Sequence, residues 1–165
     1  MKSGFRLGNI KFKFQEFVKD TQDFFKNKRV VLFSANVNSN SSEKLKNLQK
    51  VEFYFERIKK LGIQEIYCCS INNFDFLKSW FDNMKVKNVK FLPDENANFT
   101  KHVGMLSSNS EEQPKNSSKD YIAIITDGIV ERCWEYNKTQ NNQQNNGLCN
   151  TLILEDCINY LSATE

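Results

Sequence analysis

The sequence has little of what several classes of site require. Its 165 residues include one histidine, six glycines and two prolines. His102 cannot build a histidine-based metal site alone, and no Cys-x-x-Cys pair exists to complete one. No glycine-rich phosphate loop is present. Asp94 and Glu95 are adjacent in a predicted turn and should point apart, which disfavours a paired-carboxylate mechanism. We therefore expect no metal and no cofactor.

Long apolar runs are also missing. No stretch approaches the ~18 apolar residues of a membrane helix, and no apolar signal-peptide core is present. Five cysteines without regular spacing do not form the framework of a secreted disulfide protein and fit a reducing compartment. The net charge is only +3, and basic residues are not interleaved with aromatics, so no nucleic-acid partner is expected.

Acidic residues are absent from the first fifteen positions. The first is Glu16, whereas Met1–Gln15 carries four basic residues: Lys2, Arg6, Lys11 and Lys13. The composition is similar to that of a mitochondrial presequence, although the segment is short and poor in serine, and chance in a lysine-rich chain is the competing explanation. We expect a mitochondrial location, with the cytoplasm as the alternative, and leave open whether Met1–Gln15 is cleaved.

The rest of the chain alternates between strand-like and helix-like patterns. Apolar content of 39% and charged content of 26% are typical of one soluble globular domain. The predicted strands are 30–33, 63–71, 89–92, 120–126 and 129–134, the last two joined by the turn signal Asp127-Gly128. The predicted helices are 14–25, 45–61 (ended by Gly62), 73–84 (opened by Asn73), 98–105 and 152–161.

This order predicts an α/β fold with a central mixed sheet and helices on both faces. The predicted organisation is an N-terminal extension and helix over residues 1–28, followed by one domain over residues 29–165. Within that domain, the polar stretch 107–119 reads as a loop. The Asn/Gln-rich stretch 137–147 is predicted to be a solvated insertion.

Several of these segments together carry a family resemblance. In order and spacing, six segments resemble the redoxin branch of the thioredoxin-like fold: Val30–Ser34, Leu61–Asn73, Lys78–Phe81, Val89–Asp94, Gly104–Leu106 and Tyr121–Val130. The resemblance is to the type-5 peroxiredoxins and runs from about Val30 to about Tyr136. It implies a thioredoxin-like fold, and we expect the N-terminal hairpin usual in the family to be reduced or missing.

The resemblance also shows where the catalytic motif should be. The family carries Pro-x-x-x-Thr-x-x-Cys after its first core strand, and the ungapped register between Ser34 and Gly62 places these positions at Asn36, Asn40 and Glu43. Its catalytic arginine corresponds to Ser117. A carboxylate cannot replace the thiolate that attacks a peroxide. Glu43 follows the N-cap candidates Ser41-Ser42, and a carboxylate at that place suits the N-terminus of a helix instead.

The cysteines remain candidates for residual thiol chemistry. Cys68 and Cys69 lie in a predicted buried strand, where alternation puts their side chains on opposite faces. Cys149 lies near the place where some family members keep a resolving cysteine, and it would have no attacking cysteine to resolve. Cys133 and Cys157 are expected to be ordinary core or half-buried residues.

We therefore expect an inactive peroxiredoxin-like protein, a pseudoenzyme, acting as an accessory subunit of a larger assembly of the respiratory-chain type. Its partners would be other protein subunits, and a dimer through the former peroxiredoxin interface is a further expectation. Two alternatives stay open. One is an active thiol peroxidase or oxidoreductase that uses a displaced cysteine, and the other is a free-standing regulator that binds a genuine peroxiredoxin.

Overall fold

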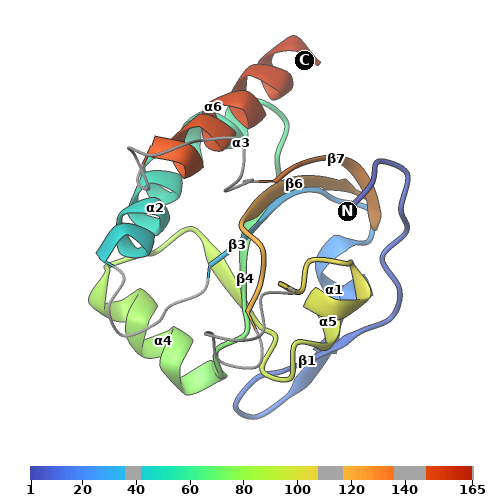
Figure 1. Cartoon of the computed structure of the whole chain (residues 1–165), viewed down its shortest axis with the longest axis vertical. Coiled ribbons are helices and arrows are strands. Elements are labelled where there is room, and N and C mark those ends of the chain that lie inside the picture. The colour runs from blue at the N-terminus through green and yellow to red at the C-terminus, as the bar shows by residue number, and fades with distance from the viewer. Residues whose placement is uncertain (36–41, 108–116, 136–147, 165) are drawn as a thin grey trace.

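A computed structural model shows a five-stranded sheet with helices on both faces (Figure 1). It describes residues 1–35, 42–107, 117–135 and 148–164. The strands are β1 (Lys11–Lys13), β2 (Val18–Asp20), β3 (Arg29–Ser34), β4 (Glu65–Ser70), β5 (Lys90–Pro93), β6 (Tyr121–Thr126) and β7 (Ile129–Glu135). The helices are α1 (Thr21–Phe25), α2 (Ser42–Phe53), α3 (Phe55–Lys60), α4 (Phe74–Asn83), α5 (Asn98–His102) and α6 (Leu148–Ala163).

The main sheet has the order β5-β4-β3-β6-β7, and β1 and β2 form a separate antiparallel pair. β3, β4 and β5 run parallel, whereas β6 and β7 are antiparallel to their neighbours. Between their polar end residues, β3 and β4 are apolar and buried because both of their faces are covered. The predicted α/β thioredoxin-like fold with a mixed sheet is confirmed.

Two apolar clusters fill the space on the two faces of the sheet. α2, α3, α4 and α6 cover one face, and the cluster there includes Leu48, Trp80 and Cys157. α1, α5 and the N-terminal hairpin cover the other, where Phe12, Phe25 and Phe99 are fully buried. Among the described residues, no helix is both long and apolar enough to cross a membrane.

The turn between β6 and β7 follows its sequence signal. Asp127 has a φ of +50° and Gly128 a φ of +75°, as a two-residue hairpin turn with left-handed central residues requires. Gly128 tolerates this conformation because it has no Cβ. Asp127 also accepts a hydrogen bond from the Asn27 amide at 2.8 Å, which ties the turn to the segment before β3.

The N-terminal region differs from the prediction of a helix over residues 14–25. Only Thr21–Phe25 is helical, because Asp20 caps the helix there by accepting from the amides of Gln22 and Asp23. The preceding residues form the β1–β2 hairpin, whose strands have three residues each, so a hairpin is present rather than missing. The predicted boundary between residues 28 and 29 stays a prediction.

Residues 1–15 contribute to the folded core. Gly4 donates to the Val130 carbonyl at 2.7 Å and Leu7 to the Gly128 carbonyl at 2.8 Å, so the chain start lies beside β7. Phe12 of β1 is fully buried and contacts the rings of Phe24 and Phe99. Cleavage after residue 15 would therefore remove a core side chain.

The helix predicted over residues 45–61 is two helices, α2 and α3. Tyr54, with φ −88° and ψ 4°, separates them, and Gly62 at φ +91° follows the end of α3. α2 carries Glu52, whose Oε1 accepts from the amides of Lys87 and Asn88 and from the Asn88 side chain, and whose Oε2 accepts from Val89. This carboxylate fixes the loop that leads into β5.

Replacing Glu52 by Gln should destabilise the protein at neutral pH by about 1 kcal/mol, because one acceptor becomes a donor facing the Val89 amide. Partial burial raises the pKa of Glu52, but the hydrogen bonds from Val89, Asn88 and Lys87 outweigh it, so the pKa is lowered. The stabilisation is therefore present above the pKa of the unfolded chain and is lost as pH falls through the lower, folded pKa.

Urea unfolding at pH 7 and at pH 3 measures this difference. The gap between wild type and Glu52→Gln should be smaller at pH 3. Glu56→Gln is the matched control, because Glu56 is exposed on α3. Equal stability of wild type and Glu52→Gln at pH 7 would show that the carboxylate does not hold the loop.

Candidate functional site

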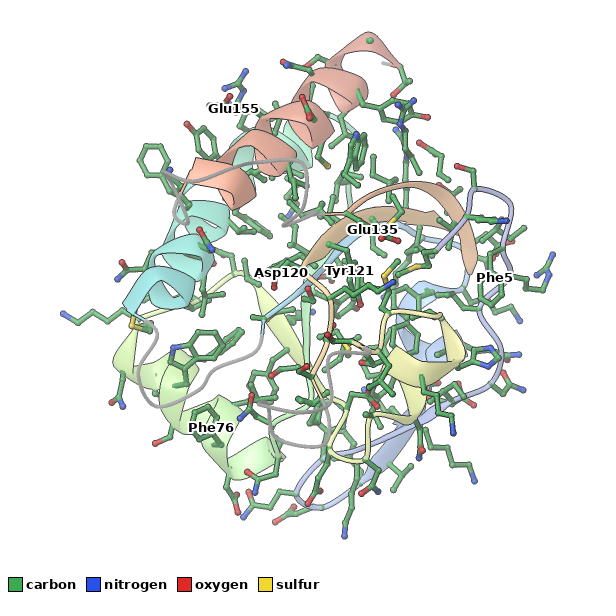
Figure 2. All side chains as sticks on the ribbon, in the orientation of Figure 1. Phe5, Phe76, Asp120, Tyr121, Glu135 and Glu155 are labelled. Atoms are coloured by element: carbon green, nitrogen blue, oxygen red, sulfur yellow. The ribbon has the colours of Figure 1, made fainter. Side chains whose placement is uncertain are left out.

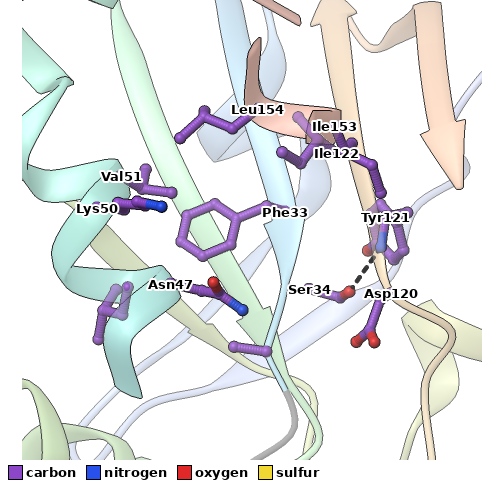
Figure 3. A pocket seen from close by; sticks show the side chains of 12 residues that line it. Phe33, Ser34, Asn47, Lys50, Val51, Asp120, Tyr121, Ile122, Ile153 and Leu154 are labelled. Carbon is purple, nitrogen blue, oxygen red and sulfur yellow. Dashed lines mark hydrogen bonds between the residues drawn. The ribbon is translucent and has the colours of Figure 1, made fainter. Parts of the chain in front are cut away.

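A small cavity lies where the end of β3, the start of β6 and helices α2 and α6 meet (Figure 3). Its volume is about 30 Å³, roughly the space of one water molecule. Its lining is mostly apolar with a polar rim: Phe33, Ser34, Ala35, Asn47, Leu48, Lys50, Val51, Asp120, Tyr121, Ile122, Ile153 and Leu154. Figure 2 shows Asp120 and Tyr121 near the middle of the molecule, where β6 begins.

The hydroxyl of Ser34 joins two sides of this site. It donates to the Lys119 carbonyl at 2.9 Å and accepts from the Tyr121 amide at 3.0 Å (Figure 3 draws the second contact). These two bonds hold the start of β6 against the end of β3. Sequence reasoning missed this role, because the partners lie 85 and 87 positions from Ser34 and no local motif signals the contact.

The segment before β6 is held as well. The Lys119 amide donates to the Met105 carbonyl, and the Ser107 amide donates to the Ser117 carbonyl, both at 2.7 Å. Ser117, the position predicted to correspond to the family's arginine, is therefore fixed by backbone bonds and is half-buried. A serine hydroxyl there carries no charge, so it cannot supply the electrostatic stabilisation that a guanidinium gives to developing negative charge.

Glu43 lies in the first turn of α2, as the capping pattern predicts. It precedes Asn47, a cavity-lining residue, by about one helical turn. The side chain of Glu43 is not among those described. Asn36 and Asn40, the other two motif positions, lie outside the described residues, as do the insertion at 137–147 and most of the polar stretch 107–119.

The described lining of the cavity offers no nucleophile for peroxide. It includes neither a cysteine nor an arginine, and its single carboxylate, Asp120, is half-buried at the rim. Among the described residues, no group of three or more histidine, cysteine or acidic side chains could hold a metal ion. The arrangement is that of a packed end of a sheet with a polar edge.

Cys68 and Cys69 lie on opposite faces of β4, each in a different apolar cluster. Both are buried and unpaired. Burial raises the pKa of Cys68, and burial together with the Asp94 carboxylate raises the pKa of Cys69. A thiol with a raised pKa holds little thiolate at neutral pH and is a poor nucleophile.

The other described thiols are similarly placed. Cys133 on β7 is half-buried, and burial raises its pKa to about 11. Cys157 on α6 is fully buried, and burial raises its pKa to about 12. Cys149 lies in the first turn of α6, where its side chain is not among those described.

Asp94 and Glu95 are adjacent in sequence but have different environments. Asp94 is 3% exposed and accepts from the amides of Phe99 and Thr100 and from the Thr100 hydroxyl. Glu95 is exposed. Asp94 thus anchors α5 to the end of β5, a structural role that its position in a Pro-Asp turn does not reveal.

Comparison with known proteins finds relatives in one enzyme family. A peroxiredoxin of Rhizobium etli is 35% identical over 117 residues, which are 71% of this chain and 65% of that protein. A peroxiredoxin of Sinorhizobium fredii is 30% identical over 118 residues, 72% of this chain and 63% of that protein. The chain thus spans a little under two thirds of the length of these relatives. No family model matches the chain.

Solved structures with a similar fold include peroxiredoxins as well. The crystal structure of reduced Prx3 from Vibrio vulnificus superposes with a TM-score of 0.81 over 96% of this chain and 99% of that one, at 19% sequence identity. An identity this low shows a common fold and no more. The chain is thus similar to peroxiredoxins in sequence, over 71–72% of its length, and in fold.

Proposed function

We propose that this chain is a peroxiredoxin-family protein without peroxidase activity, which acts as a protein-binding, accessory component of a larger assembly. The observation that carries the proposal is the state of the thiols. All four described cysteines are buried or half-buried and have raised pKa values. Peroxide reduction requires the opposite, an accessible thiolate.

The sequence register supports the same proposal. At the start of α2 the chain has Glu43 where the family resemblance places a cysteine, and Ser117 stands at the arginine position. A carboxylate at a helix N-terminus is favoured by about 0.3–1 kcal/mol, so Glu43 has a structural reason to be there. Loss of nucleophile and cation together leaves the fold as a rigid scaffold, since function resides in sites rather than in folds.

Native migration tests the binding role. Extracts of the protein's own cells, made with a gentle detergent, are separated by size without denaturation, and the fractions are probed for this chain. We expect migration in a large complex with a constant set of partner subunits. Migration as a ~20–40 kDa species, the size of one domain or its dimer, would remove the assembly from the proposal. Mitochondria are the compartment that we propose to fractionate first.

Thiol alkylation separates the proposal from the alternative of an enzyme with a displaced cysteine. At pH 7, iodoacetamide should modify Cys68, Cys69, Cys133 and Cys157 of the folded protein slowly, because burial disfavours each thiolate. One rapidly modified cysteine would favour the displaced-cysteine enzyme, and Cys149 is the position to inspect first. Co-elution with a genuine peroxiredoxin would favour the regulator instead.

A further inference from the structure

One exposed arginine lies over two neighbouring aromatic rings. The guanidinium carbon of Arg132 on β7 lies 5.4 Å from the ring centre of Trp134 and 5.2 Å from that of Tyr160 on α6. The two rings contact each other edge to face at 5.6 Å. Both rings are half-buried and pack against the apolar cluster under α6, while Arg132 is exposed. β7 and α6 lie side by side here (Figure 1).

The carboxylate next to Arg132 in sequence is already engaged elsewhere. Glu131 binds Arg29 through two contacts, Oε2 to Nη2 at 2.6 Å and Oε1 to Nε at 3.2 Å, and it also accepts from Thr126. Within the described part of the chain, no carboxylate forms a salt bridge with Arg132. The residues that follow β7, from 136 to 150, contain no aspartate or glutamate.

These contacts make Arg132 pre-organised for a partner. The guanidinium presents planar hydrogen-bond donors that match a carboxylate in a two-point contact. Restricting the side chain beforehand lowers the entropy lost on binding. Arginine, tryptophan and tyrosine are also the residues that most often dominate the energetics of protein interfaces. A phosphate backbone fits less well, because binding it requires several cations, whereas the two rings hold the guanidinium of one arginine.

We propose that Arg132, Trp134 and Tyr160 form the contact site for a partner protein that presents one carboxylate flanked by apolar side chains. The carboxylate pairs with the guanidinium, and the apolar groups cover the two rings. This inference rests on the proposed function, because it names the surface through which the chain joins its assembly.

Charge-reversal variants test the site in the native-migration experiment. Arg132→Glu should reduce the fraction of the chain in the large complex by about tenfold or more, as the loss of an interface hot spot does. Arg57→Glu is the matched control, because Arg57 is an exposed arginine that lies over a single ring, Tyr54, at 6.0 Å. It makes the same change of charge and should leave the complex intact.

Two further variants of Arg132 complete the test. Arg132→Gln removes the charge without introducing repulsion and should give the same loss, which decides the case if Arg132→Glu fails to fold by its melting curve. Arg132→Lys, treated with a carbodiimide, should become joined through its amine to an aspartate or glutamate of the partner, located by mass spectrometry. A complex that forms without such a cross-link would overturn the carboxylate contact.

The outcomes separate this inference from the function on which it rests. If wild type migrates alone, the assembly role itself is wrong, and the proposed contact site is wrong as well. If wild type migrates in a complex and Arg132→Glu and Arg132→Gln do so equally, the assembly role stands and this contact site is wrong. Release of wild type by nuclease treatment would identify a nucleic acid as the occupant and overturn the protein partner.

Discussion

Replacing Asp94 by Ala is expected to lower the free energy of unfolding by about 3–4 kcal/mol, because three buried donors lose their acceptor together. Its Oδ1 accepts from the Phe99 amide at 3.0 Å, and its Oδ2 accepts from the Thr100 amide at 2.8 Å and the Thr100 hydroxyl at 2.6 Å. Phe99 and Thr100 are buried, so water cannot readily reach the orphaned groups. α5 would lose its anchor to β5.

Urea unfolding followed by circular dichroism measures the effect. Glu95→Ala is the matched control, because Glu95 is the adjacent acidic residue and is exposed, and its loss should change stability by no more than about 0.5 kcal/mol. Asp94→Asn keeps one carbonyl oxygen and should fall between the two. If the free energy of unfolding of Asp94→Ala lies within about 1 kcal/mol of that of wild type, the carboxylate is not an anchor of α5.

Restoring the family's catalytic groups should give a peroxidase. The triple variant Glu43→Cys, Asn40→Thr, Ser117→Arg places a thiol in the first turn of α2 and a guanidinium at a position that is fixed by the bond between Ser107 and Ser117. The helix N-terminus lowers the pKa of such a thiol. With dithiothreitol as the reductant, we expect the rate of hydrogen peroxide reduction to be about 100-fold or more above that of wild type. One donor that stabilises the developing charge contributes a factor of this size.

The double variant Asn40→Thr, Ser117→Arg is the control for the nucleophile. It keeps Glu43 and should stay as inactive as wild type, since position 43 then carries no thiolate to attack the peroxide. A triple variant that folds, by its circular dichroism and melting temperature, and yet shows no gain would mean that the register between Ser34 and Gly62 is wrong.

Local sequence signals were enough to predict the sheet. β3 and β4 each contain a continuous apolar run of four residues, which is typical of strands covered on both faces. The Asp127-Gly128 hairpin is equally well signalled, because its left-handed residues are the ones its turn type selects. Asn73 caps α4 by accepting from the Phe76 amide, as a residue of its type at that place should.

The N-terminal region could not be predicted in the same way. The apolar spacing between Phe14 and Phe25 fits a helix, but the rings serve tertiary contacts instead: Phe14 stacks on Phe17 at 4.9 Å and contacts Phe74 of α4 at 6.0 Å. Spacing along the chain cannot distinguish a helical stripe from rings brought together by a hairpin. Packing against distant elements therefore overrode the local pattern.

The polar contacts of the site were beyond sequence reasoning for a related reason. Ser34 and Lys119 are linked across 85 positions, and Arg132 meets Tyr160 only because α6 lies beside β7. Serine and arginine are common surface residues, so nothing in their neighbourhoods marks them. The sequence could supply an alignment to the family's motif, which predicts that Glu43 and Ser117 stand where the catalytic cysteine and arginine would be. The triple and double variants test this alignment.

The most direct test of the central claim is the rate at which the purified wild-type protein consumes hydrogen peroxide at pH 7 with dithiothreitol as the reductant. We expect a rate no higher than that of the same protein with its thiols blocked, because the described thiols are buried or half-buried with raised pKa values. Sustained turnover that disappears when a single cysteine is replaced by serine would contradict it and make the protein a working peroxidase.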